Sequence, residues 1–332
     1  MIISRTPFRV SFFGGGTDYS EWFKDHPGAV LATTIDKYCY LTCRYLPPFF
    51  KHKSRVLYSK IENVKGIEEI DHPAVRETLR FLKISEGVEI HHDGDLPART
   101  GLGSSSSFTV GLLNSLYALL GKIPTKEQLA QEAIYIEQKM CADKVGCQDQ
   151  TLAAYGGLNY IEFGGDRHLN VQKITIGPEK IRLLQDHLML YFTGFSRLSS
   201  EITAHQIRNI PKKEKELTAM YAMTQQAVKV LDDGDLNAFG TLLDESWRLK
   251  RSLSDKVSTP EIDGMYEAAK TCGALGGKAL GAGGGGFVLL FVPPDNQPAV
   301  REALKKYLHV PFKFENLGSQ IIFYQPNTGK VD

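Results

Sequence analysis

The chain has 332 residues, of which 42% are hydrophobic and 23% charged, and this is the composition of an ordinary globular protein. Its net charge of +1 excludes the strong field that would draw a protein to nucleic acid or to an anionic membrane. The start, MIISRTPFRV, lacks the apolar core of a signal peptide, and the apolar run at 287–292 is too short to span a membrane. We therefore expect no nucleic-acid or membrane partner, and the length favours two domains.

The first half of the chain mixes strand and helix patterns. Thr125, followed three positions later by Gln128, is typical of a helix N-cap, and Gly121 is typical of a helix end. We expect strands at 38–46 and 88–92, a buried helix at 108–121 and an amphipathic helix at 126–140.

The second half has a different pattern, dominated at first by long amphipathic helices. We place the domain boundary near residue 180, which divides the chain into 1–180 and 181–332. We expect helices at 212–232, 235–253, 259–270 and 299–307, a strand at 287–292 and two further strands before residue 324.

The five cysteines are too few and too irregularly spaced for a disulfide framework or a zinc site. Their odd number predicts reduced thiols and a cytoplasmic location. His91, His92 and Asp93 have the residue types of a metal site. Adjacent side chains on a strand point to opposite faces, however, so the two imidazoles cannot bind one metal and we expect ordinary strand residues here.

Three glycine-rich segments carry the chemistry. The first, RTPFRVSFFGGGTDY at 5–19, leads from a strand into three glycines and then Asp18. An aspartate at a turn commonly caps the turn, but here Arg9 and Asp18 flank a backbone that cannot crowd them.

The second segment, ARTGLGSSSS at 98–107, runs directly into the buried helix. No lysine follows Gly103, and Ser106 stands where a dinucleotide fingerprint has its third glycine, so neither common phosphate loop fits. Its free N–H groups and helix dipole favour an anion, and its serine hydroxyls can bind phosphate or Mg²⁺. The alternative is a plainly capped helix.

The third segment, LGAGGGGF at 280–287, matches G-x-G-x-x-G, but a strand follows it where a dinucleotide site needs a helix. Its glycines predict close approach of the backbone to a ligand or to another part of the chain. Taken alone, it is best interpreted as a tight turn between packed elements.

In this order, PFRVSFFGGGTDY, PARTGLGSSSS and GAGGGG resemble the three motifs of the GHMP kinase superfamily, small-molecule kinases named for galactokinase, homoserine kinase, mevalonate kinase and phosphomevalonate kinase. The resemblance spans the whole chain. It implies an α+β, two-domain fold in which an N-terminal α/β domain and a C-terminal ferredoxin-like domain bind ATP and the acceptor in the cleft between them.

Within the superfamily, GGGTDY, KVGCQDQ and TGFSRLSSEI are most similar to bacterial D-glycero-D-manno-heptose 7-phosphate kinases, with L-fucokinase-type enzymes nearby. This resemblance implies ATP-dependent phosphorylation of the anomeric hydroxyl to give the 1,7-bisphosphate, for nucleotide-activated heptose and lipopolysaccharide. Alternatives are a fucokinase-like sugar 1-kinase acting on an unphosphorylated sugar, a non-catalytic sugar sensor on the same fold, and a nicotinamide-dependent oxidoreductase. We expect a monomer or a homodimer.

The resemblance assigns Asp149 as the catalytic carboxylate that accepts or orients the proton of the acceptor hydroxyl, and Arg9 as its cationic partner. The alternatives are a capping aspartate and a surface salt bridge. It also implies that Ser105 and Glu137 bind Mg²⁺, whereas Glu132 on the same helix is expected to be an exposed charge. The implied ATP-binding residues are Gly101, Leu102, Gly103, Ser104, Ser105, Ser106, Gly283 and Gly284.

The acceptor is expected to contact the first glycine-rich segment. Galactokinases carry Glu-His where this chain has Gly15 and Gly16, and this difference opens space for a larger sugar. Arg197 is our candidate for a second phosphate, with pairing to Glu201 as the alternative, and Lys278 is a weaker candidate for phosphate contact. The implied acceptor residues are Gly15, Gly16, Thr17, Asp18 and Arg197.

Overall fold

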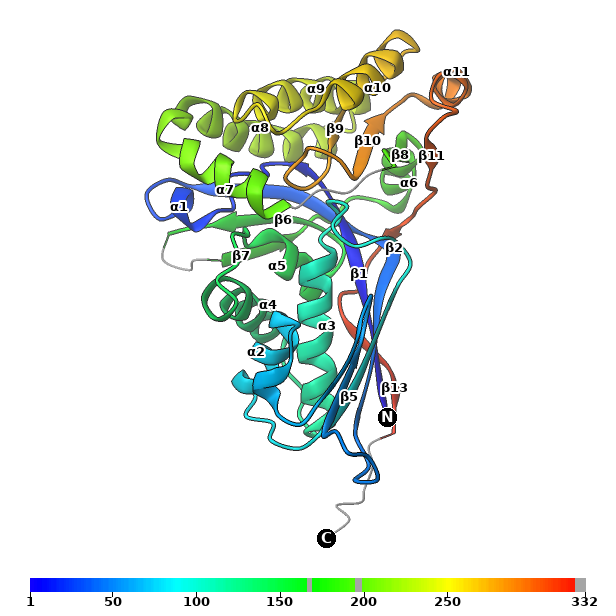
Figure 1. Ribbon diagram of the computed structural model, residues 1–332. Helices are drawn as coiled ribbons and strands as arrows, with labels where there is room; N and C mark the ends of the chain where they lie inside the picture. Colours follow the sequence, from blue (N-terminus) through cyan, green and yellow to red (C-terminus); the bar gives the residue numbers. More distant parts are fainter. Residues whose placement is uncertain (166–168, 195–198, 326–332) are drawn as a thin grey trace.

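The computed structural model describes residues 1–165, 169–194 and 199–325, and it contains two sheets with helices packed against them (Figure 1). The larger sheet has the order β13-β1-β2-β5-β3-β4, with β12 and β6 also paired to β2, and β7 paired to β6. Its strands are β1 (Ile2–Phe13), β2 (Gly28–Tyr45), β3 (Ser54–Leu57), β4 (Ile61–Val64), β5 (Val88–Gly94), β6 (Leu158–Phe163), β7 (Leu169–Lys173), β12 (Phe314–Glu315) and β13 (Gln320–Tyr324).

The long strand β2 organises this sheet. It is rich in β-branched and aromatic residues, and it pairs antiparallel with β1, with β6 along its first half and with β5 along its second. The segment expected as a strand at 38–46 is therefore only the second half of a longer element. The pairing of β1 with β2 shifts register between Pro7 and Phe8, just before Arg9.

Helices cover one face of the large sheet (Figure 1). The central one, α3 (Ser104–Leu119), is buried along nearly its whole length because its residues are apolar or small on every side. Around it lie α2 (Pro73–Phe81), α4 (Lys126–Tyr135) and α5 (Gln148–Tyr155). Thr125 caps α4 by accepting a hydrogen bond from the Gln128 amide, as the sequence predicts, but the helix continues as a π-helical turn over Ile136–Met140.

The smaller sheet is antiparallel, with the order β11-β8-β10-β9. Two long helices, α8 (Glu214–Asp233) and α9 (Leu236–Ser252), confirm the expected amphipathic pair, and α8 also packs on β1 and β2. The other elements here are β8 (Leu188–Phe192), β9 (Gly276–Ala279), β10 (Phe287–Phe291), β11 (Leu308–His309), α6 (Pro178–Asp186), α7 (Ser199–Asn209), α10 (Pro260–Thr271) and α11 (Gln297–Ala303), while α1 (Ser20–Phe23) follows the first strand.

The end of the chain returns to the large sheet. β12 pairs with β2, and β13 pairs with β1. The expected α+β class is confirmed, because the strand pairs within the described ranges are antiparallel except for the pairing of β3 with β5. The division into 1–180 and 181–332 remains a prediction. Across the part of the chain that the structure describes, every helix is either too short or too polar to cross a membrane.

Candidate active site

A buried arginine joins three segments that lie far apart in the sequence. Arg9 lies on β1 with 4% of its surface exposed. Its Nε and Nη2 each donate a hydrogen bond of 2.8 Å to one carboxylate oxygen of Asp149, and its Nη1 donates to the Gly101 carbonyl at 2.5 Å. A planar guanidinium matches a carboxylate in this two-bond geometry. Its burial rules out the alternative of a surface salt bridge.

Asp149 lies in the first turn of α5, where a carboxylate interacts favourably with the helix dipole. A quarter of its side-chain surface remains exposed, although Arg9 holds both of its oxygens. The carboxylate is therefore fixed in position and still accessible to a molecule outside the protein.

The second glycine-rich segment passes directly over this ion pair. Gly103, the residue before α3, has a φ of +76°, and a Cβ at this position would lie 3.2 Å from Arg9 Cγ and 3.4 Å from Asp149 Oδ2. No side chain caps α3, so the alternative of a plainly capped helix does not hold. The first N–H groups of this buried helix are available to an anion beside Asp149.

The third glycine-rich segment packs backbone to backbone against the second. A Cβ at Gly101 would lie 2.4 Å from the Leu280 carbonyl oxygen, and one at Gly286 would lie 2.2 Å from the Thr100 oxygen. Neither position has room for a side chain. The glycines at 280–287 thus meet another part of the chain, and β10 follows them where a dinucleotide site would have a helix.

Gly283 and Gly284, assigned to ATP by resemblance, face a different neighbour within this segment. A Cβ at Gly283 would lie 2.2 Å from the Val257 carbonyl oxygen, and the Gly284 amide donates to that same oxygen at 2.9 Å. These two glycines therefore hold the loop against the segment that follows α9.

Asp18 is connected to Asp149 by Gln148, the first residue of α5 and the neighbour of Asp149 in the chain. It is 2% exposed, and its carboxylate accepts hydrogen bonds from the Gly16 amide at 2.9 Å and from Gln148 Nε2 at 3.0 Å. Burial raises the pKa of the Asp18 carboxyl. A Cβ at Gly146 would collide with this carboxylate, so the glycine there makes room for it.

The other residues of the first loop differ in whether they face the polar site or the protein interior. The Thr17 hydroxyl is fully buried and donates to the Gly14 carbonyl, so it stabilises the loop itself. Gly16 packs against the side chains of Leu217 and Leu253. Gly15 faces the polar site, because a Cβ there would lie 3.4 Å from the ammonium of Lys250.

Lys250 is a site residue that the sequence analysis missed. It lies on α9 with 4% exposure, and its Nζ donates to the Gly281 carbonyl at 2.6 Å. Burial lowers the pKa of Lys250 to about 8. A signal was present in the sequence, since Leu243, Trp247 and Lys250 follow helical spacing and the first two are core residues.

Lys278, the weaker candidate for phosphate contact, lies on β9 and is 2% exposed. Its Nζ donates to the Phe12 carbonyl at 2.8 Å, and burial lowers its pKa well below the usual value. Neither Lys250 nor Lys278 forms an ion pair with a described carboxylate. The centre thus brings the guanidinium of Arg9 and the buried amines of Lys250 and Lys278 close to the carboxylates of Asp18 and Asp149.

Glu137, expected to bind metal, lies in the π-helical turn with 1% exposure. Its Oε2 accepts hydrogen bonds from Ser106 Oγ at 2.9 Å and from Gln150, whereas its buried Oε1 has no hydrogen-bond partner among the described residues. Burial raises the pKa of Glu137 to about 7. The structure pairs Glu137 with Ser106 and leaves Ser105 exposed one position away.

These oxygens fit a hard divalent cation. Mg²⁺ takes few protein ligands and keeps water and phosphate oxygens as the others. A carboxylate with an unpartnered oxygen beside the Ser106 hydroxyl is such a partial donor set. No cluster of three or more histidine, cysteine or acidic side chains that could hold a metal occurs within the described ranges.

The remaining expectations have mixed outcomes. His91 lies near Glu89 at 3.3 Å while His92 packs edge-on to Phe108, which confirms that the two imidazoles face opposite sides. Glu132 is not a free surface charge, because the Tyr117 hydroxyl donates to its carboxylate at 2.7 Å. Each of the five cysteines is a free thiol. Arg197 lies outside the described residues.

Comparison with known proteins identifies the family. A family described as GHMP kinases N terminal domain matches residues 70–157, and one described as GHMP kinases C terminal matches residues 226–310. D-glycero-alpha-D-manno-heptose 7-phosphate kinase of Campylobacter jejuni is 31% identical over 92% of this chain and 93% of that protein. The bifunctional fucokinase/GDP-fucose pyrophosphorylase of Arabidopsis thaliana is 24% identical over 93% of this chain and 32% of that protein.

Solved structures agree on the fold. The crystal structure of a D-glycero-D-manno-heptose 1-phosphate kinase from Bacteroides thetaiotaomicron matches with a TM-score of 0.77 and 22% identity, over 96% of this chain and 98% of that chain. Both family domains occur in order, and a relative more than 30% identical aligns over nearly the whole of both chains. The chain therefore belongs to the GHMP kinase family.

Proposed function

We propose that this protein transfers the γ-phosphoryl group of ATP to the anomeric hydroxyl of D-glycero-D-manno-heptose 7-phosphate and forms the 1,7-bisphosphate. Its family makes it an ATP-dependent sugar kinase. The observation that carries the proposal is the buried pair of Arg9 and Asp149 directly beneath the uncapped start of α3. This arrangement places an accessible carboxylate beside a site for a polyanion.

In the proposed reaction, the anomeric oxygen of the sugar bonds to the γ-phosphorus as the bond from that phosphorus to the β,γ-bridging oxygen breaks. Asp149 accepts the proton of the attacking hydroxyl, and ADP leaves with the bridging oxygen. Arg9 fixes the Asp149 carboxylate in the orientation of attack and adds positive charge beside the transferring group.

The start of α3 holds the triphosphate in this proposal. Backbone N–H groups from Gly101 to Ser106 face the phosphates, and the absence of a side chain at Gly103 keeps the space beside Asp149 open. Ser105, Ser106 and Glu137 would hold Mg²⁺, which neutralises phosphate charge when bound. Gly283 and Gly284 support this loop from the other side.

The acceptor binds at the first loop. Asp18 can accept hydrogen bonds from two neighbouring hydroxyls, and Lys250 supplies a cation 3.4 Å from the Cβ position at Gly15. The absence of a side chain at Gly15, which faces the polar site, suits an acceptor larger than a hexose, while Gly16 packs against leucines and Thr17 stabilises the loop. We assign the acceptor's own phosphate to Arg197.

The cellular setting is also a proposal. We place the enzyme in the cytoplasm, as a monomer or a homodimer, and its product in the supply of nucleotide-activated heptose for lipopolysaccharide. The five free thiols support a reducing compartment.

A coupled ADP-release assay tests the substrate. D-glycero-D-manno-heptose 7-phosphate, unphosphorylated heptose, L-fucose, galactose and mannose are compared at equal concentration with excess Mg²⁺. We expect kcat/KM to be highest for the 7-phosphate, by about 100-fold or more over the unphosphorylated heptose, because the acceptor's phosphate then pairs with the guanidinium proposed to bind it. A preference for L-fucose would favour the fucokinase alternative, which the relative from Arabidopsis thaliana supports.

A further inference from the structure

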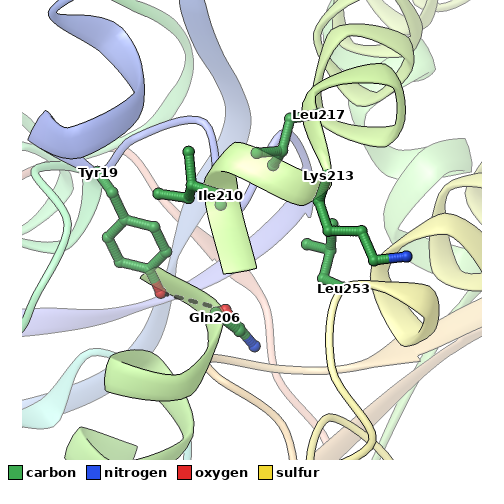
Figure 2. Close-up of a pocket in the computed structure, with 7 residues that line it drawn as sticks. Tyr19, Gln206, Ile210, Lys213, Leu217 and Leu253 are labelled. Atoms are coloured by element: carbon green, nitrogen blue, oxygen red, sulfur yellow. Dashed lines mark hydrogen bonds between the residues drawn. The ribbon is translucent and has the colours of Figure 1, made fainter. Parts of the chain in front are cut away.

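A glutamine on α7 is hydrogen-bonded to two of the glycine-rich segments, and Figure 2 shows the bond to Tyr19. Gln206 is 5% exposed, and its Nε2 donates a hydrogen bond of 2.9 Å to the Ala282 carbonyl. Its Oε1 accepts a longer hydrogen bond, of 3.4 Å, from the Tyr19 hydroxyl. One orientation of the amide satisfies both partners, because the carbonyl needs a donor and the hydroxyl supplies one.

The two partners of Gln206 belong to the two halves of the site. Tyr19 directly follows Asp18 in the loop proposed to bind the acceptor. Ala282 directly follows Gly281, whose Cβ position lies 2.6 Å from the Cα of Gly101 in the loop proposed to bind ATP. Any displacement of one loop is therefore passed to a residue that also contacts the other.

A buried hydrophobic cluster that includes Tyr19, Ile210 and Leu253 packs around this link. Beside it lies a small apolar pocket, and Figure 2 shows the Tyr19 ring and the Gln206 side chain at its edge. The pocket is lined by Gly16, Tyr19, Gln206, Ile210, Lys213, Leu217 and Leu253.

We propose that Gln206 is a positioning residue that couples nucleotide binding to the order of the acceptor loop. The inference rests on the proposed assignment of the two loops to ATP and to sugar. Binding of ATP against Gly101 and Gly103 steadies the segment 280–287, Gln206 holds Tyr19 to that segment, and Asp18 is then presented to the acceptor. By linkage, the acceptor strengthens nucleotide binding by the same factor.

The same helix offers a matched control. Asn209 Nδ2 donates to the Leu253 carbonyl at 2.9 Å, so it anchors α7 to the end of α9 through a hydrogen bond that involves neither glycine-rich loop. A variant at Asn209 therefore reports what simple loosening of α7 does. Gln206→Leu keeps the size of the side chain and removes both hydrogen bonds, while Gln206→Glu keeps only an acceptor for Tyr19.

The first experiment measures amide hydrogen exchange in the full-length protein with and without a non-hydrolysable ATP analogue and Mg²⁺. In the wild type, we expect the analogue to slow exchange at both 280–287 and 14–19. In Gln206→Leu, protection persists at 280–287 and disappears at 14–19, whereas Asn209→Leu behaves like the wild type. Equal protection of 14–19 in Gln206→Leu, or its equal loss in Asn209→Leu, would overturn the inference.

The second experiment measures the dissociation constant of the analogue by calorimetry, with and without the sugar that the wild type phosphorylates fastest. We expect the sugar to tighten nucleotide binding about fivefold or more in the wild type and in Asn209→Leu, and less than about twofold in Gln206→Leu. Gln206→Glu should fall between them. A wild type that shows no tightening contradicts the coupling. Failure to phosphorylate heptose 7-phosphate contradicts only the proposed substrate, since the exchange experiment needs no sugar.

Discussion

Arg9 holds both carboxylate oxygens of Asp149 at 2.8 Å, and its third hydrogen bond reaches the Gly101 carbonyl, so one side chain fixes the carboxylate and the loop above it. The pair connects β1 to α5 across 140 positions of the sequence. Because Arg9 is buried and Asp149 is partly exposed, the Asp149 carboxylate is accessible while the arginine holds it in place. Its chemistry and its geometry can be tested separately.

The chemistry is tested by Asp149→Asn. Asparagine keeps one acceptor oxygen for Arg9 but cannot take a proton, so we expect kcat to fall by about 10²- to 10⁴-fold with the fold retained. The control is Asp263→Asn, because Asp263 also lies in the first turn of a helix and pairs with an arginine, Arg251, at 3.0 Å. Steady-state ADP release and thermal unfolding are measured on both variants. Full turnover by Asp149→Asn would support the sugar-sensor alternative.

The geometry of the loop is tested by Gly103→Ala. Gly103 and Gly121 have similar φ angles of +76° and +70°, so alanine at either position costs about 1–2 kcal/mol of backbone strain. Only Gly103 has the ion pair within contact distance of a new Cβ, because nothing lies within 4 Å of that position at Gly121. We expect both variants to lose similar stability in urea unfolding, and only Gly103→Ala to lose kcat/KM for ATP, by about 10-fold or more. Equal kinetics in the two variants would argue against a role for this turn in binding.

The charge of Lys250 makes activity depend on pH. Burial lowers its pKa to about 8, with Asp18 and Asp149 opposing the shift and Arg9 adding to it. The ammonium is therefore lost as pH rises through about 8, and we expect kcat/KM for the phosphorylated sugar to fall in the same range. Lys250→Arg should move this fall to higher pH, since arginine stays charged.

Stability is expected to change in the opposite direction over the same pH range. Between about pH 8 and the ordinary lysine pKa of 10.5, the unfolded chain keeps the Lys250 proton and the folded protein has released it. Unfolding then takes up a proton, so the free energy of unfolding rises with pH. Urea unfolding of the wild type and Lys250→Met across this range checks the sign. An unchanged slope in Lys250→Met would show that another group causes it.

The proposed metal role of Glu137 is tested against a neighbour on the same helical segment. Glu137→Gln removes the charge beside Ser106, so we expect the Mg²⁺ concentration for half-maximal activity to rise by about 10-fold or more. Glu132→Gln keeps an oxygen for the Tyr117 hydroxyl and should leave the requirement unchanged. Titration of Mg²⁺ at fixed ATP separates the two. A similar requirement in both variants would exclude Glu137 as a ligand.

Local patterns in the sequence predicted the helices and the three glycine-rich segments well. Each of these predictions depends on residues within a few helical turns of one another. Examples are the apolar run after Ser107, the N-cap formed by Thr125, and the amphipathic helices α8 and α9. The pairing of Arg9 with Asp149 followed only from resemblance to a family, and the meeting of Gly101 with Gly281 was not predicted, because no local pattern encodes contacts between distant segments.

The features that sequence analysis missed are non-local. Lys250 lies at a core position of α9. Its role in the site becomes visible only from the tertiary structure, which places its ammonium beside Gly15 of the first loop. Glu132 was expected in solvent, but Tyr117 from α3 reaches it. The full length of β2 was also missed, because its first half is stabilised by pairing with β6 more than a hundred positions away.

The return of β13 to the edge of β1 has a consequence for how the protein is made. Arg5 is hydrogen-bonded to Gln320, which the ribosome adds 315 positions later. Throughout elongation on the ribosome, the outer edge of β1 lacks the neighbour it will finally have, and an unpaired strand edge invites association with other chains. Premature termination anywhere before residue 320 would leave that edge permanently open, so quality control of nascent chains should recognise such products as misfolded.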